Sequence, residues 1–260
     1  MTKLLSNPGR VRRLFTDTPP HFYHLEADVP RVEMKDFIIG ISGADAATVD
    51  KYLKEIRDHD RFVAAIEDGF AKTAERPDNL SQNWREMLYA LVRAKEPDTI
   101  VETGVYDGLS SAYILQAISD AGYGHLVSID INDTTYMPTD LPMPDVNTGW
   151  LVPECLQSNW NLKYGDAREL LPKVVEQTPP TVFLHDSLHT KEHMLFEFET
   201  AIESMGSGNV LLSDNVMFND AFETVADQYL RDVQFLNNTT ETITHEGKEI
   251  DDRFGGGVVR

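Results

Sequence analysis

The sequence VETGVYDGLS at Val101–Ser110 lies where an expected strand turns into an expected helix. Gly104 and Gly108 allow the backbone to pass close to a ligand, and the N-terminus of the helix faces that ligand. The spacing Glu-x-Gly-x-x-x-Gly differs from the Gly-x-Gly-x-x-Gly of dinucleotide-binding folds. We therefore expect Glu102 to face the ligand, where an acid suits a cationic amino group better than a diphosphate.

Strands and helices alternate on the C-terminal side of this stretch, which is typical of a parallel sheet covered on both faces. The expected strands are Thr99–Gly104, His125–Ile131, Asn161–Gly165, Thr181–His185, Asn209–Ser213, Gln234–Leu236 and Phe254–Val259. The expected helices are Leu109–Ala121, Ala167–Glu176 and Lys191–Met205. The last two strands are joined by a connection too short and polar for a crossover helix, so we expect them to pair antiparallel. The fold class is α/β, a Rossmann-like, doubly wound sheet of seven strands with the last antiparallel.

The N-terminal part of the chain, residues 1–79, shows no such alternation. Ser42 is the expected N-cap of a helix through Val49 and Ile56, and a second helix is expected at Phe62–Ala74. We interpret residues 1–79 as a helical lid or oligomer contact, which would let the chain form a homo-oligomer. Residues 80–260 then form one catalytic domain.

A long segment, Asn132–Gln157, separates two of the expected strands and contains four prolines. Loops of this length inside a compact domain usually have a function or are disordered. This one leaves the carboxyl end of a strand, where ligands bind in parallel sheets.

The composition limits the partners and the compartment. The 43 acidic residues against 23 basic residues give a net charge of −20, which disfavours nucleic acid and anionic membranes as partners. We expect no membrane span, because no apolar run approaches the roughly 20 residues that one needs. A single cysteine, Cys155, excludes an internal disulfide, so a cytoplasmic location is expected. The dispersed acidic residues also agree with a halophilic source, although ordinary acidic proteins share this property.

An acidic residue, Asp130, ends the second expected strand, about where an acid binds ribose hydroxyls in doubly wound folds. With Glu102 and the glycines, it favours a ligand with a ribose, an ammonium group and no phosphate.

The chain here resembles the class I S-adenosylmethionine-dependent methyltransferases, over roughly Leu80–Arg260. The resemblance implies that the methionine end of the cofactor is lined by Glu102, Gly104, Tyr106, Gly108 and Ser110. It implies that Asp130 holds the ribose and that the adenine lies near Gly165, Asp166 and Ala167. Ile131 and Asp186 complete the expected cofactor-binding residues. Tight turns for the glycines and helix capping for Asp166 are the alternatives.

Two polar segments follow the fourth and fifth strands, HDSLHT from His185 and SDNV from Ser213. Neighbouring strand ends place Asp186, Asp214 and Asn215 around one point, and three oxygen donors suit magnesium. The presence of histidine leaves manganese or iron open. Alternatively, Asp186 caps the helix that begins near Thr190.

The pairing of these segments resembles the metal-dependent O-methyltransferases of the catechol type, whose ligands are an Asp after the fourth strand and Asp-Asn after the fifth. That family has a lysine base three positions after the first Asp, whereas this chain has His189. Asp-x-x-His is similar to the O-methyltransferases that act on macrolide sugars, where the histidine is the proposed base. Those enzymes carry Glu-Asp after the fifth strand, so the two resemblances imply different acceptors. His185 and His193 are expected to be structural or exposed.

The function that we expect is divalent-metal-assisted transfer of a methyl group from S-adenosylmethionine to a small hydroxylated molecule. His189 is the expected general base, because an unperturbed imidazole accepts a proton near neutral pH. The alternatives are a methyltransferase of the same fold that acts on nitrogen or carbon without metal, and a non-catalytic protein that binds the cofactor. An NAD-dependent oxidoreductase is disfavoured because Glu102 would face the pyrophosphate.

Overall fold

A computed structural model describes residues 31–71, 83–131, 147–237, 242–245, 248–251 and 254–260. Residues 1–30 and 72–82 and most of the expected loop Asn132–Gln157 lie outside these residues. No helix in the described part is long and apolar enough to cross a membrane.

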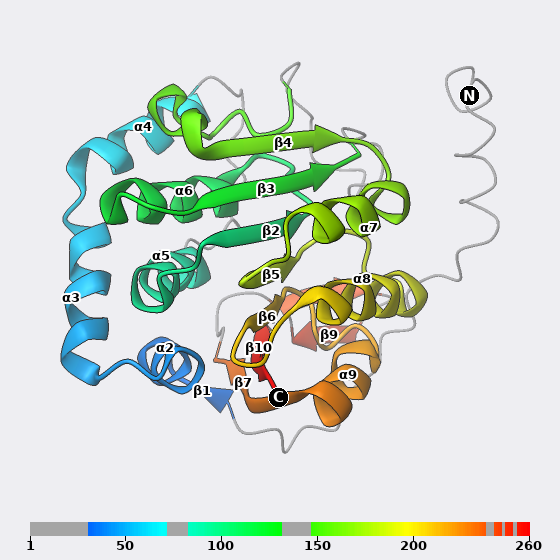
Figure 1. The fold of residues 1–260 in the computed structure, drawn as a ribbon. Coiled ribbons are helices and arrows are strands. Elements are labelled where there is room, and N and C mark those ends of the chain that lie inside the picture. Colours follow the sequence, from blue (N-terminus) through cyan, green and yellow to red (C-terminus); the bar gives the residue numbers. More distant parts are fainter. Residues whose placement is uncertain (1–30, 72–82, 132–146, 238–241, 246–247, 252–253) are drawn as a thin grey trace.

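The centre of the fold is an eight-stranded sheet in the order β1-β7-β10-β6-β5-β2-β3-β4 (Figure 1). Its strands are β1 (Arg31–Val32), β2 (Thr99–Thr103), β3 (His125–Asp130), β4 (Trp160–Tyr164), β5 (Val182–His185), β6 (Val210–Ser213), β7 (Leu230–Leu236) and β10 (Gly255–Val259). The five strands from β6 to β4 in this order pair parallel, and β10 pairs antiparallel with both β6 and β7. The α/β fold with its antiparallel last strand is therefore confirmed.

Helices cover both faces of the sheet. The helices are α2 (Met34–Ser42), α3 (Ala46–Arg57), α4 (Asp60–Ala71), α5 (Asn83–Lys95), α6 (Leu109–Ala121), α7 (Ala167–Gln177), α8 (Lys191–Ser204) and α9 (Ala221–Tyr229), with a 3-10 helix η3 (Glu154–Asn159). Alternate strand residues point to opposite faces: Ile100 packs with α5 and α6, whereas Val101 packs with α7 and α8. Both faces are buried, so the parallel strands are almost continuously apolar.

The N-terminal helices share the core of the sheet. Phe37 of α2 packs edge-on against Phe254 with ring centroids 6.1 Å apart, and Phe62 of α4 packs against Tyr113 of α6 at 4.9 Å. Figure 1 shows α2–α4 on the side of the molecule that faces away from α8 and α9. Within the described residues 31–71 the chain is mainly helical, while the role of residues 1–79 as a lid or oligomer contact stays a prediction.

Four details differ from the sequence expectations. Ser42 does not begin a helix: it ends α2, and its hydroxyl donates to the Ile38 carbonyl at 2.6 Å. Asp45 is the N-cap of α3 and accepts from the backbone of Thr48. The sheet has an eighth strand, because β1 adds parallel to β7. The last two expected strands pair antiparallel as predicted, with β10 between β7 and β6, and the unexpected detail is a hairpin of β8 (Thr242–His245) and β9 (Lys248–Asp251) that precedes β10.

Candidate functional site

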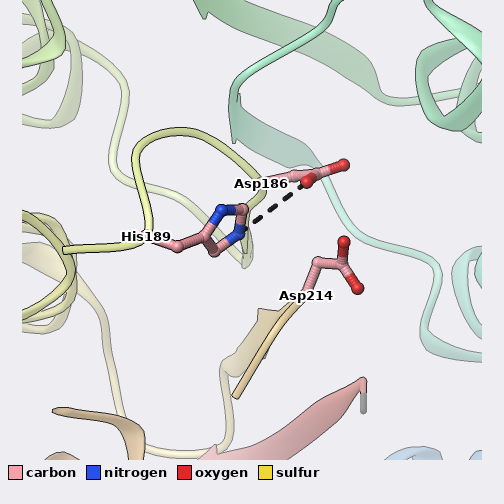
Figure 2. Close-up of side chains that lie close together, drawn as sticks. All are labelled: Asp186, His189 and Asp214. Atoms are coloured by element: carbon pink, nitrogen blue, oxygen red, sulfur yellow. Dashed lines mark ion pairs between the residues drawn. The ribbon is translucent and has the colours of Figure 1, made fainter. Parts of the chain in front are cut away.

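The carboxyl ends of β5 and β6 bring three titratable side chains together. Asp186 directly follows β5, Asp214 directly follows β6, and His189 lies in the turn before α8. One ligand atom from each lies within 4.8 Å of the others, and His189 Nε2 is 4.0 Å from Asp186 Oδ1. Figure 2 shows the imidazole and the two carboxylates around a common space. The structure thus gathers the base and two of the metal ligands expected from the sequence.

The third expected ligand, Asn215, lies at the same place in a left-handed backbone conformation with φ of 52°. Its Nδ2 donates to Asp214 Oδ2 at 3.0 Å and lies 3.4 Å from His189 Nε2. Its Oδ1 is buried and has no hydrogen-bond partner among the described residues. A buried amide oxygen without a donor is unfavourable, and a cation is one group that could satisfy it.

The electrostatics of the cluster also favour a cation. Burial, and then the neighbouring carboxylate of Asp214, raise the pKa of Asp186 well above its usual value, while Arg85 of α5 opposes the shift. The neighbouring carboxylate disfavours the ionised form of Asp186 in this buried space, and a divalent ion would remove this penalty. The oxygen donors therefore fit a hard divalent cation.

His189 stays neutral more easily than an ordinary histidine. Burial, and then the neighbouring His185, lower its pKa well below the usual value. A neutral imidazole at this position is able to accept a proton. The capping alternative for Asp186 is not supported, because Thr190 is the N-cap of α8 and accepts from His193 N at 3.3 Å.

The turn of residues 104–108, called the glycine loop below, packs directly on the chain segment that follows β5. Gly104 has a φ of 83°, and a Cβ atom there would lie 1.9 Å from the carbonyl oxygen of Asp186. Asp186 N also donates to Thr103 O at 2.8 Å. The close approach that requires Gly104 is therefore to the backbone of Asp186. Gly108, with a φ of 84°, approaches Gly149 in the same way.

We predict that Gly104→Ala lowers the free energy of unfolding far more than Gly122→Ala. Both glycines have positive φ, which costs roughly 1–2 kcal/mol for alanine. Only Gly104 adds a clash, because nothing lies within 4 Å of a Cβ at Gly122, which ends α6. Chemical denaturation of both variants measures the difference. Equal losses would contradict the packing role of Gly104.

Glu102 points into the core between β2 and α6. Its carboxylate is fully buried and accepts hydrogen bonds from Ser110 at 2.7 Å, Ser111 at 2.5 Å and Ser128 at 2.8 Å. Burial raises its pKa, and the three hydroxyls oppose the shift. In this structure Glu102 and Ser110 therefore bind each other and fix the first turn of α6.

Asp130 holds the glycine loop from the end of β3. Its Oδ2 accepts from the backbone of Val105 at 2.8 Å and of Tyr106 at 3.1 Å, and its Oδ1 lies 3.5 Å from the Thr148 hydroxyl. Tyr106 itself has a φ of 50°, and its ring packs edge-on against Trp150. The hydrogen bonds of Asp130 therefore connect the end of β3 to Val105 and Tyr106 of the loop that is expected to bind the cofactor.

The turn after β4 lies beside Asp130. Gly165 N donates to Asp130 O at 2.9 Å, Asp166 is the N-cap of α7 and accepts from Arg168 N, and Ala167 begins that helix. The capping alternative for Asp166 is thus present. Ile131, next in the chain to Asp130, exposes 41% of its surface, so an apolar side chain faces solvent at this edge.

A pocket of about 470 Å³ borders the Asp130 side of the site. Its lining residues are Asn147, Thr148, Gly149, Trp150, Gln157, Trp160, Leu162 and Tyr164. β4 lies three strands from β5, and strands lie about 4.8 Å apart. The pocket is therefore lined by a strand three places along the sheet from β5 and by Thr148, whose hydroxyl lies near Asp130.

Two residues near the site were not found by sequence reasoning. Arg85 lies close enough to oppose the rise that burial causes in the pKa values of Asp186 and Asp107. Glu197 is a fully buried acid of α8 that binds both His185 and His193. A signal for Glu197 exists in the sequence, because it falls on the apolar stripe of Met194, Phe198 and Ala201.

Residues 101–216 match the family model described as a methyltransferase domain. Among solved structures, an O-methyltransferase from Bacillus cereus in complex with S-adenosylhomocysteine is similar, with a TM-score of 0.57, 17% identity and coverage of 82% of this chain and 97% of that one. TomG, an O-methyltransferase from Streptomyces achromogenes involved in tomaymycin synthesis and bound to S-adenosylmethionine, has a TM-score of 0.53, 19% identity and coverage of 75% and 90%. A comparison with curated protein sequences found no match.

Proposed function

We propose that the chain transfers a methyl group from S-adenosylmethionine to a hydroxyl of a small molecule, assisted by a divalent cation. The match of residues 101–216 to the methyltransferase-domain model and the similarity of the fold to that of an O-methyltransferase support the proposal. Asp186, Asp214 and Asn215 are the proposed ligands of the cation, with magnesium as the first choice. His189 is the proposed general base.

The observation that carries this proposal is the cluster of Asp186, His189 and Asp214 beside the glycine loop. A methyl donor held by that loop and an acceptor held by the cation would meet at the edge of the sheet between β2 and β5. Methyl transfer needs alignment of donor and acceptor and removal of one proton. The cluster offers a base and an oxygen-rich cation site within a few ångströms.

The proposed cofactor site extends from the glycine loop to the turn after β4. Asp130 lies where an acceptor for the ribose hydroxyls is expected, and the exposed Ile131 offers an apolar surface for the adenine of the cofactor. The buried Glu102 acts in this proposal through Ser110 and the first turn of α6, whose N-terminus faces the methionine end. This assignment changes the part of Glu102 from a direct ligand to a support of the loop.

The chemistry assigns one task to each group. When bound, the cofactor supplies an electrophilic methyl group and the cation makes the acceptor hydroxyl more acidic. His189 would take the proton of that hydroxyl at its imidazole as the methyl group passes to the hydroxyl oxygen. Asp186 and Asp214 would hold the cation.

The acceptor is proposed to be a small molecule that binds on the Asp186 side of the sheet. The pocket at β4 is about three strands away, so its position suits the nucleotide end of the cofactor and not the reacting hydroxyl. The net charge of −20 supports a small or neutral acceptor over a nucleic acid.

The test is methyl transfer from labelled S-adenosylmethionine to catechol-type and sugar-type hydroxyl acceptors, with magnesium and with chelator. Transfer that needs the cation supports the proposal. Transfer to nitrogen or carbon that survives the chelator would favour a metal-independent enzyme, and cofactor binding without transfer to any acceptor would favour a non-catalytic binding protein.

We predict that Asp130→Ala weakens S-adenosylmethionine binding by at least roughly 100-fold, because several hydrogen bonds of a charged acceptor are lost together. The variant loses the proposed ribose contact and also the two backbone bonds that hold Val105 and Tyr106. Calorimetry measures the affinity, and Asp166→Ala, which removes only a helix cap, is the control. Unchanged affinity in Asp130→Ala would contradict the cofactor assignment.

A further inference from the structure

Behind the Asp186 cluster, on the α8 side, lies a buried network centred on the carboxylate of Glu197. Its Oε2 accepts from the Thr103 hydroxyl and from His185 Nδ1, each at 2.5 Å. Its Oε1 accepts from the Ser187 hydroxyl at 2.9 Å and from His193 Nε2 at 2.8 Å. Both Glu197 and His185 are fully buried.

The hydrogen bonds of Glu197 satisfy its buried carboxylate. A buried carboxylate loses much of its solvation, and this loss is tolerated only when its lone pairs are satisfied. Glu197 has four donors, which matches the capacity of two carboxylate oxygens. Burial alone would raise its pKa, but the hydrogen bonds and charges of His185 and His193 hold that pKa well below the usual value.

Three of the four donors come from the two strand ends that build the site, and the fourth, His193, belongs to α8 itself. Thr103 is the last residue of β2 and directly precedes Gly104, whereas His185 and Ser187 are the two neighbours of Asp186 in the chain. Thr103 and His185 are also paired in register across β2 and β5. Glu197 of α8 therefore binds both the residue that precedes the glycine loop and the two residues that flank Asp186.

The network also reaches the proposed base. The ring of His185 packs edge-on against the ring of His189, with centroids 5.1 Å apart and an interplanar angle of 79°. Glu197 fixes the orientation of His185 through Nδ1, so it also fixes the surface against which His189 packs. The other ring nitrogen of His185, Nε2, is buried and has no hydrogen-bond partner among the described residues.

We propose that Glu197 is a positioning residue, which sets the geometry of Asp186 through the flanking His185 and Ser187 and that of His189 through the ring of His185. The proposal rests on the proposed function, in which Asp186 binds a cation and His189 accepts the proton. It assigns a role in the site to a residue of α8 that touches neither donor nor acceptor.

The test compares Glu197→Gln with Val174→Ala. Glutamine keeps the size of the side chain but replaces one acceptor oxygen by a donor, so at least one of the four bonds is lost. Val174 is buried in the same hydrophobic cluster as Phe198 of α8 and belongs to α7, away from the network. Val174→Ala therefore lowers stability without changing the site.

Three properties are measured in Glu197→Gln, in Val174→Ala and in the unaltered protein. Mn²⁺ binding is measured by electron paramagnetic resonance with the metal alone, and we expect it to weaken by roughly 10- to 100-fold in Glu197→Gln, the usual effect of losing a residue that orients a ligand. Turnover should fall by a similar factor, with the KM for S-adenosylmethionine within a few-fold. The ¹⁵N resonances of the His189 ring, assigned with His189→Gln, should shift in Glu197→Gln and not in Val174→Ala.

The outcomes separate the positioning role from the proposed function. If the unaltered protein binds no Mn²⁺, the proposed cation fails, and the His189 resonances still decide whether Glu197 positions that ring. If Glu197→Gln matches Val174→Ala in all three measurements, Glu197 is merely structural and the proposal is overturned. If Glu197→Gln does not fold, Ser187→Ala removes one donor beside Asp186 and should weaken Mn²⁺ binding, whereas unchanged binding would overturn the role.

Discussion

Asp214→Asn is expected to abolish metal-dependent methyl transfer while the protein itself becomes more stable. The substitution keeps the shape of the side chain and removes one of the two charges that the cation would neutralise. A catalytic metal ion contributes several kcal/mol of charge stabilisation, so we expect turnover to fall by roughly 100- to 10,000-fold. The affinity for S-adenosylmethionine should stay within a few-fold, because Asp214 follows β6, two strands from the glycine loop after β2.

The gain in stability follows from the pKa of Asp186. Burial and the charge of Asp214 raise that pKa, so the folded metal-free protein binds a proton more tightly than the unfolded chain does. The stability of the metal-free protein therefore falls as the pH rises through the usual pKa range of an aspartate and on toward the raised pKa of Asp186. Removing the Asp214 charge relieves part of this repulsion, and the midpoint of thermal unfolding without metal should rise at neutral pH.

The control for Asp214→Asn is Asp227→Asn, which removes an exposed aspartate of α9. It should leave metal dependence and turnover unchanged. Full activity of Asp214→Asn in the presence of chelator would refute the proposed cation, and an unchanged thermal midpoint would contradict the repulsion between the two buried acids.

His189→Ala should lower turnover by roughly 100- to 10,000-fold, the usual contribution of a positioned proton acceptor. His189→Gln should be nearly as poor, because it keeps a hydrogen-bonding group without basicity. Metal affinity should change little, since the proposed ligands are Asp186, Asp214 and Asn215. Loss of the metal in both variants would instead make His189 a ligand and favour a metal other than magnesium.

The pH dependence gives a second measure of His189. Its pKa is lowered by burial and by His185, so the neutral, basic form persists below the usual histidine range. The acid limb of the turnover profile should therefore lie below pH 6.5, the unperturbed histidine value. The control is His125→Gln. His125 is the first residue of β3, at the opposite end of the parallel strands from His189, and this variant should keep the full pH profile.

The sequence predicted the parallel sheet well, because buried parallel strands leave continuous apolar runs between helices of regular period. It was less informative where two signals compete. Ser42 and Asp45 are both good N-cap residues three positions apart, and Gly43, with a φ of 74°, ends the first helix between them. The strand β1 is only two residues long, which is too short for a periodic signal.

The sequence predicted which candidate residues lie together where strand ends decide their position, and it did not predict the contacts that depend on side-chain direction. Asp186, Asp214 and His189 follow neighbouring strands, so topology alone brings them together. The direction of Glu102 depends on three serines, two of which lie eight and nine positions later in α6. Glu197 depends on donors from β2 and β5 that are up to 94 positions away, and no local pattern contains them.

The place of β10 between β6 and β7 has a consequence for how the chain reaches its native state during synthesis. In the described sheet, β7 and β1 join the parallel strands only through β10, which is made after every other strand. Until residues 255–259 leave the ribosome, the backbone groups along β6 and β7 face solvent as two open edges, which are prone to pairing with other chains. The parallel strands can therefore pair before β10 is made, whereas β7 and β1 can join the described sheet only once β10 is present.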